Sequence, residues 1–416
     1  MAIPREKTTT RPAGIWHAFS AAPHRMFFLV GTAQIVLIMA WWAITLCGRY
    51  GLFPPARTAL DPVWAHAFFM IYGLFPLFIF GFLATVYPRW MNTPALSRRT
   101  YVSASLLLGS GIVLFYAGLY MGTTIVALAT VVLLCGWLTV LVALLGVCRL
   151  ANRVGPYEWI FNLALAAGAA GVVCFTVAAV GGSYSWFVAA RELGLWVFLV
   201  PVIFGVSHRM IPFFGSSVLQ NYRVVQPAWS LPLVLACAAG HGALVLFGQR
   251  RWLFLCDLPL MLAGIYHTIA WGFRRSFEQR LLAMLHIAFS WLSLAMALYA
   301  TQSLILLGSG RLLLGRAPLH ALGIGFMLGM VVAMVSRVSL GHSGRALAAD
   351  SLTWNALLGV NVTALLRLAA ALAAPFFVHA DLFNLAAASA WLAWLVPWVW
   401  RYAPMYLRRR VDGRVG

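Results

Sequence analysis

Histidines inside apolar stretches are the residues of this sequence best suited to chemistry. Neutral imidazole is a common ligand for haem iron and copper, and ionisable groups in lipid are costly unless they serve a site or a partner. The nine carboxylates lie near the ends of the predicted helices, so few acids can pair with the histidines. We therefore predict a metal centre among these residues: His66, His208, His241, His267, His286, His320 and His342.

Helix direction separates these histidines into two groups. His320 and His342 are 22 residues apart, roughly 33 Å along a helix, so they cannot share one mononuclear site. The outer group contains His66, His320 and His241. The inner group contains His342, His286, His208 and, at its margin, His267. We predict that His66 and His320 are axial ligands of an outer haem, because both begin helices that start on that side.

Arginines accompany the inner histidines. Arg209 follows His208, while Arg337 and Arg345 flank His342 in the stretch "RVSLGHSGR". With few acids available, we expect an anion to neutralise them, and guanidinium groups suit the propionates of haem. The alternative is that these arginines reach lipid headgroups and that the neighbouring glycines merely end the helix.

The elements that must position these residues are membrane-spanning helices. Hydrophobic residues make up 63% of the 416 residues and charged residues only 9%, which exceeds what a soluble core could bury. Apolar stretches long enough to cross a bilayer begin near Phe27, Trp64, Tyr101, Thr124, Tyr157, Glu192, Trp229, Trp252, Leu281, Pro318, Leu352 and Leu382. The fold class is therefore all-α, a polytopic membrane protein of about twelve helices, and the alternating segments of a barrel are not seen.

The predicted organisation is simple. Residues 1–26 form an N-terminal segment, residues 27–400 the transmembrane domain, and residues 401–416 a basic tail. Most of the 29 Lys and Arg residues fall on the side of the two termini, so we expect both termini in the cytoplasm of a bacterium, with the domain in its inner membrane. The net charge of +20 lies in short loops, which suits anionic lipid and argues against nucleic acid.

The cysteines exclude two kinds of cofactor. None of the six cysteines lies in a CxxC or CxxCH pattern. Covalently attached haem and cysteine-ligated clusters are therefore not expected.

Four stretches of the chain resemble the NnrS family of membrane proteins: "WAHAFFMIYGLFPLFIFGFLATVYPRW", "HRMIPFF", "LLAMLHIAFSW" and "HALGIGFMLGMVVAMVSRVSLGHSGR". The resemblance implies a haem- and copper-containing protein, with haem b as the haem, associated with nitric oxide metabolism in denitrifying or nitrosatively stressed bacteria. The residues that carry over are His66, Arg209, His286, His320, Arg337, His342 and Arg345.

The chain departs from the family pattern at two places. Phe68 and Phe69 stand where many members have a second histidine and a glutamate, which puts any ligand or proton donor from that pair in doubt. His208 stands where the family often has glycine. The distribution of histidines also resembles that of haem-copper oxidase catalytic subunits, but the paired histidines of that pattern are missing here.

Three functions remain open. The first is a haem-binding redox protein, with or without copper, that binds, detoxifies or reduces nitric oxide, using an electron donor that the sequence does not identify. Whether it is a nitric oxide reductase-like oxidoreductase is not decided. The second is a secondary transporter or export channel for a small solute or metal ion. The third is an assembly or scaffold subunit with packed, hydrogen-bonded histidines.

Overall fold

The computed structural model describes residues 14–380 and 382–413, which form helices without a single strand. About 80% of the protein is helical. The prediction of an all-α polytopic membrane protein is thereby confirmed. Apolar composition explains this, because in lipid a backbone group must be paired within its own segment or in a closed barrel.

Eleven helices among the described residues are long and apolar enough to cross a membrane. They are α2 (Pro23–Arg49), α3–η1–α4 (Pro62–Trp90), α5 (Arg98–Met121), α6 (Thr123–Leu150), α7 (Pro156–Ala179), α8–η2–α9 (Tyr184–Val218), η3–α11 (Arg250–Ala270), α13 (Arg280–Ser309), α14–η4–α15 (Ala317–His342), α16 (Ser351–Ala373) and α17 (Leu382–Leu407). The shorter apolar helix α10 (Ser230–Leu246) corresponds to the remaining predicted span. Two short helices, α1 (Ile15–Phe19) and α12 (Phe273–Ser276), lie outside these spans.

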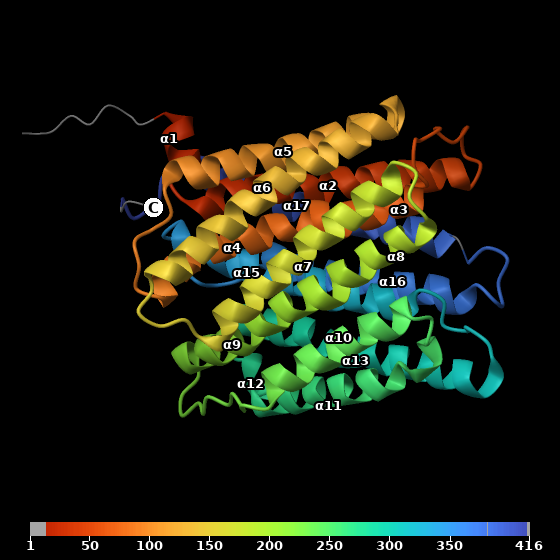
Figure 1. The fold of residues 1–416 in the computed structure, drawn as a ribbon. Helices are drawn as coiled ribbons and strands as arrows, with labels where there is room; N and C mark the ends of the chain where they lie inside the picture. Colours follow the sequence, from red (N-terminus) through yellow and green to blue (C-terminus); the bar gives the residue numbers. More distant parts are fainter. Residues whose placement is uncertain (1–13, 381, 414–416) are drawn as a thin grey trace, which may run out of the picture.

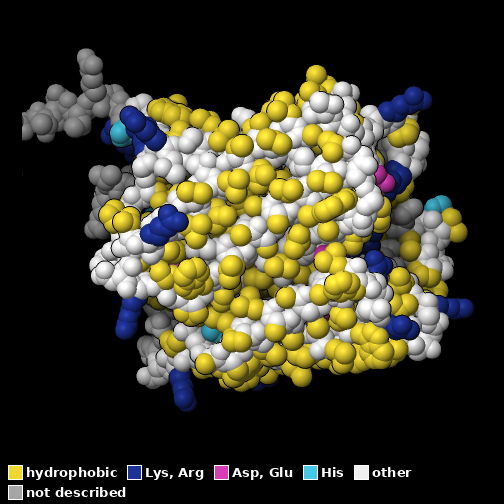
Figure 2. All heavy atoms as spheres, viewed as in Figure 1, with side chains coloured by type: hydrophobic (Ala, Val, Ile, Leu, Met, Phe, Trp, Pro, Cys, Tyr) yellow, Lys and Arg dark blue, Asp and Glu magenta, His cyan; other side chains and the backbone are white. Residues whose placement is uncertain are grey.

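The helices form one elongated bundle (Figure 1). Helix α1 and the end of α17 lie at the same end of the bundle, which we call the terminal end; the other is the distal end. Figure 2 shows a face covered with hydrophobic side chains, and most of the Lys and Arg side chains visible there lie toward its two ends. This is the surface expected of a protein that spans a bilayer lengthwise.

Two spans form the centre of the bundle. In its most apolar stretch, Pro62–Trp90 is 89% buried and Ala317–His342 is 78% buried, whereas the corresponding value for Leu382–Leu407 is 28%. The candidate histidines His66, His320 and His342 therefore lie on the two helices that are best shielded from lipid. Helix α2 begins at Pro23, so its first turn includes residues that were expected in the N-terminal segment.

Three π-helical segments interrupt spans near the distal end. They are η1 (Phe69–Leu74), η2 (Leu193–Leu199) and η4 (Ala321–Leu328). Each widens a helix just after a polar residue: η1 follows His66 closely, and η2 and η4 directly follow Glu192 and His320. Such widened turns are rare and are often found at functional sites, because they change the direction in which side chains point.

Candidate functional site

His66 and His320 lie at the distal end of the bundle on the two central spans. The imidazole of His66 stacks on Trp42, with ring centroids 4.2 Å apart. Its Nδ1 is buried and has no hydrogen-bond partner among the described residues. His66 and His320 are close enough to interact electrostatically, as are Arg316 and Arg367 with both of them.

Hydrogen bonds determine which nitrogen of His320 carries the proton. Nδ1 lies 2.9 Å from the carbonyl oxygen of Arg316, which can only accept, so Nδ1–H is the donor. Nε2 then presents its lone pair, and Arg367 of α16 donates to it over 3.3 Å. A histidine held through Nδ1 by a backbone carbonyl is in the tautomer that binds a metal through Nε2, and here the metal would displace Arg367 from that nitrogen.

A second pair of imidazoles lies at the terminal end. The ring that lies against His342 is that of His24, with centroids 4.4 Å apart and planes tilted by 43°. The charges that act on both rings come from Arg25, Arg89 and Arg410. These contacts give His342 a different neighbour from the expected His286 and His208.

Sequence analysis missed His24 because it placed this residue in the N-terminal segment. One signal could have found it. Pro23 directly precedes His24, and proline is favoured in the first turn of a helix, where its missing N–H costs nothing. Starting the first span at Pro23 would have placed His24 at the same end as His342.

The C-terminal tail packs against the stretch "RVSLGHSGR" and forms hydrogen bonds with it. Gly344 has a φ of +75°, and a β-carbon there would lie 2.7 Å from the side chain of Asp412. Arg410 donates to the carbonyl of His342 over 3.3 Å, and the Val411 amide donates to the carbonyl of Ser343 over 3.0 Å. The glycine thus turns the chain past the helix end, as expected, and makes room for the tail.

The three candidate arginines have different surroundings. Arg209 binds the Glu158 carboxylate at 2.7 Å and lies 3.9 Å over the ring of Trp90. The expectation that an anion must neutralise Arg209 is therefore corrected, because the protein supplies the carboxylate itself. Arg337 lies 3.9 Å over Phe214 and has no carboxylate partner among residues 14–380 and 382–413.

Arg345 lies outside the spans, just after the helix end. Its Nη1 is buried without a hydrogen-bond partner in the described part of the chain. Burial lowers the pKa of Arg345 below its usual value, and repulsion from Arg401 and Arg408 lowers it further. An anionic group would relieve both effects, so the prediction that Arg345 holds an anion is retained.

His208 is tied to the protein at both ring nitrogens. Its Nδ1 lies 2.7 Å from the Tyr157 hydroxyl and its Nε2 lies 2.6 Å from the Ser230 hydroxyl. Both nitrogens are engaged by short hydrogen bonds to hydroxyl groups of the protein, so His208 is held more tightly than His320, whose Nε2 contact is 3.3 Å long. Its arrangement is that of a hydrogen-bonded core histidine.

The other inner histidines are buried with unused nitrogens. His267 stacks on Trp271 at 4.5 Å, and neither of its ring nitrogens has a partner among the described residues. His286 is likewise buried with Nε2 unpartnered among them. Both lie toward the terminal end, but their ring contacts are with aromatic residues and His208 rather than with His342.

His241 has the closest carboxylate of any histidine in the described chain. Its Nδ1 lies 2.6 Å from Oδ1 of Asp257, and its ring stacks on Trp196 at 3.6 Å. His241 belongs to the distal half, as expected, but its surroundings are different from those of His66 and His320.

Metal-binding groups occur as pairs in this structure. Within residues 14–380 and 382–413, no three His, Cys, Asp or Glu side chains come together as a metal cluster. A haem needs only two axial ligands from the protein, since the porphyrin supplies the other four nitrogens. Paired histidines therefore suit haem better than a closed site for a bare ion.

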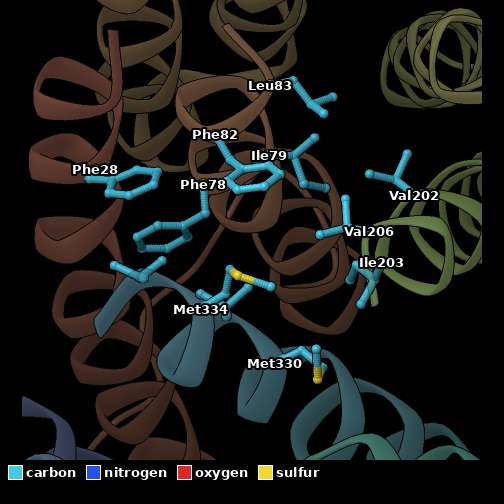
Figure 3. A pocket seen from close by; sticks show the side chains of 12 residues that line it. Phe28, Phe78, Ile79, Phe82, Leu83, Val202, Ile203, Val206, Met330 and Met334 are labelled. Atoms are coloured by element: carbon cyan, nitrogen blue, oxygen red, sulfur yellow. The ribbon is translucent and has the colours of Figure 1, made fainter. Parts of the chain in front are cut away.

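A small apolar cavity lies in the core, between α2, α4, α9 and α15 (Figure 3). Its volume is about 60 Å³, and Phe28, Phe78, Val206, Met330 and Met334 are among the side chains around it. It lies about two helical turns inward from His342, because Met334 precedes that residue by eight positions. An apolar space of this size suits a small uncharged molecule and is unsuited to an ion.

The family model described as NnrS protein matches residues 18–410. The chain belongs to the NnrS family. The match includes every candidate residue named above, with His24 near its beginning and Arg410 at its end. The comparison with curated proteins found no match. Membership of the NnrS family, together with the helical fold, makes this a membrane protein linked to nitric oxide.

Proposed function

We propose that this NnrS protein is a haem-binding redox protein that handles nitric oxide within the bacterial inner membrane. The observation that carries the proposal is the distal pair, in which His66 and His320 approach one another on the two most buried spans. His66 has a buried Nδ1 without a partner among the described residues, and the Nε2 lone pair of His320 accepts a hydrogen bond from Arg367 over 3.3 Å, which a ligand could displace.

The residues of the distal pair fit a haem b. His66 and His320 would hold it through their imidazoles, and Trp42 would hold the first imidazole by stacking. Arg367, which now donates to His320, is placed to bind a propionate instead. When bound, the haem supplies an iron that exchanges electrons and binds nitric oxide.

The terminal pair is a second candidate cofactor site. His24 and His342 would supply imidazole ligands to copper or to another haem, and Arg25 and Arg89 would compensate negative charge beside it, while Arg410 is already bound to Asp412 at 2.6 Å. Arg337 and Arg345 would hold anionic groups near the same helix end. Thr85 fixes the start of α2 by accepting a hydrogen bond from the His24 amide over 3.2 Å.

The apolar cavity supplies a place for nitric oxide itself. Nitric oxide is small and uncharged, so it enters the bundle from lipid and needs no polar path. The cavity in Figure 3 would hold it among Phe and Met side chains at about two turns from the terminal pair. Electrons would come from a partner that binds at one end of the bundle.

Haem content tests the proposal. We expect purified protein to show a Soret band and a pyridine haemochrome, and His66→Ala and His320→Ala each to lose most of the haem. The matched control is His379→Ala, since His379 is exposed in the loop between α16 and α17 at the same end. Copper is measured on the same samples. Folded His66→Ala and His320→Ala proteins with unchanged haem would refute the assignment.

The terminal pair is tested in the same way with His24→Ala and His342→Ala. Loss of copper or of a haem component from both variants, with the distal haem retained, is the expected result. Unchanged cofactor content and unchanged nitric oxide consumption in both variants would leave this pair a packing contact.

A further inference from the structure

A polar cavity lies at the distal end, between α8, α10, α13 and the segment that precedes α14. Its volume is about 300 Å³, five times that of the apolar cavity of about 60 Å³. Its lining includes ionisable side chains: Arg191, Glu192, His241, Arg250, Tyr299 and Arg316. Nothing in the haem proposal requires such a space.

The charges around this cavity are mostly positive. Arg191 is bound to Glu192 at 2.6 Å, and Glu192 is almost fully buried. Arg250 and Arg316 are exposed, and neither has a carboxylate partner among the described residues. One carboxylate therefore balances only one of three guanidinium groups, so the opening of the cavity attracts anions and repels metal cations.

The floor of the cavity is a rigid imidazole. His241 is 1% exposed, and its ring is held between the stacked Trp196 at 3.6 Å and the edge-on Tyr299 at 4.9 Å. Asp257 binds Nδ1 from behind at 2.6 Å. Nε2 is then the nitrogen left to face the cavity that His241 lines.

We propose that this cavity binds a small inorganic oxyanion, with Arg250 and Arg316 at its mouth and His241 at its floor. Guanidinium groups bind oxyanions with paired hydrogen bonds, and Tyr299 adds a neutral donor from the side. A cavity of about 300 Å³ is many times the size that one water molecule needs. It therefore admits an ion of the size of nitrate or phosphate with some hydration.

The site adjoins the proposed haem site but is chemically separate from it. The backbone carbonyl of Arg316 accepts from His320, while the Arg316 side chain lines the cavity. Because the mouth lies at a membrane-facing end, the phosphate of a lipid headgroup has the same chemistry as a free ion. The experiment must distinguish these two sources.

Calorimetric titration of the purified full-length chain tests the proposal. In chloride-free buffer and neutral detergent, sodium phosphate and sodium nitrate are titrated into the wild type, Arg250→Gln and Arg316→Gln. We expect saturable binding of at least one ion, roughly tenfold weaker in each variant, the size expected for one lost charge-assisted contact. The matched control is Arg311→Gln. Arg311 is exposed in the same loop as Arg316 but does not line the cavity, so this variant should bind the ions as the wild type does.

A lipid arm identifies the source of the oxyanion. Thermal unfolding is compared in nanodiscs of phosphatidylglycerol and of phosphatidylcholine. In one outcome, phosphatidylglycerol stabilises the wild type while free ions do not bind. If Arg250→Gln and Arg316→Gln then abolish this stabilisation, the result supports the site and shows that a lipid headgroup occupies it. Binding that is unchanged in both variants, or absent for free ions and lipid alike, overturns the proposal. Neither readout depends on haem, so a missing Soret band would overturn only the haem proposal.

Discussion

At the scale of single residues, hydrogen bonds distinguish the histidines that are packed into the core from those that could serve a site. His208 uses both ring nitrogens within the protein, whereas His66 leaves a buried nitrogen unused. Sequence reasoning could identify both as membrane histidines, but it could not separate them. The partners of His208 are distant in sequence, since Tyr157 precedes it by 51 positions and Ser230 follows it by 22.

The pair of Arg209 and Glu158 shows the same limit. Glu158 was recognised as a residue near a helix end, but its contact with Arg209 depends on how α7 packs against α9. A count of the acidic and basic residues in the sequence cannot predict that contact. The three residues Arg209, Trp90 and Tyr157 also form a cation–π arrangement that no local pattern indicates.

We predict that Arg209→Gln destabilises the protein by about 1–3 kcal/mol, because it leaves the buried Glu158 carboxylate without its partner. Thermal unfolding in detergent measures the loss. The double variant Arg209→Gln with Glu158→Gln should recover much of it, since no charge is then left unpaired. Equal destabilisation in the single and double variants would show that the carboxylate is not the cause.

At the scale of helices, the length of the apolar stretches predicted every span, because a bilayer imposes a minimum apolar length on each. The π-helical segments were not predicted. They lie where spans contact one another, as at Tyr72 of η1, whose hydroxyl donates to the carbonyl of Ala190 just before η2. Gly171 of α7 and Gly194 of η2 leave the space that this tyrosine occupies.

We predict that Gly171→Ala costs about 1–3 kcal/mol of stability, because its β-carbon would overlap the Tyr72 hydroxyl in a packed interior. The control is Gly146→Ala in α6, where the added carbon meets nothing within 4 Å. Unfolding temperatures of the two variants are compared. Adding Tyr72→Phe to Gly171→Ala should restore part of the loss, and an equal effect of both glycine substitutions would contradict this account.

Asp350, the N-cap residue of α16, makes the stability of this helix start depend on pH. Its carboxylate accepts from the amide and hydroxyl of Thr353 and lies 3.4 Å from Arg401. Partial burial alone would raise the pKa of Asp350, but the hydrogen bonds from Thr353 and the charge of Arg401 outweigh it and hold the pKa below its usual value. The stabilisation is therefore present above the unfolded pKa of about 3.9 and is lost as the pH falls through the lowered folded value.

We predict that Asp350→Asn removes this acid-dependent part of the stability while keeping an N-cap, and that Asp350→Ala costs about 1 kcal/mol at neutral pH. Unfolding is measured between neutral pH and the acid limit of the detergent system. If Asp350→Asn and the wild type lose stability in parallel below the usual pKa of aspartate, the carboxylate makes no such contribution.

At the scale of the whole molecule, the bundle has two chemically different ends. The terminal end contains His24, His342 and the returning C-terminal tail, while the distal end contains the His66 and His320 pair and the polar cavity. Sequence reasoning assigned His342 and His320 to opposite ends from their separation alone. It could not predict His24 beside His342, because that contact joins residues 318 positions apart.

The orientation of the bundle decides which compartment the oxyanion cavity faces. Basic residues are retained on the cytoplasmic side during insertion, and their excess at the terminal end predicts that this end is cytoplasmic and that the cavity opens to the periplasm. Two exposed arginines allow a test, since Arg274 follows the terminal end of α11 and Arg311 lies in a distal loop. We predict that an impermeant maleimide labels Arg311→Cys in spheroplasts and labels Arg274→Cys only in inside-out vesicles.

The unsubstituted protein controls for the native cysteines, of which Cys135 is the exposed one. The reverse labelling pattern would place the termini in the periplasm, and the cavity would then draw its anion from the cytoplasm.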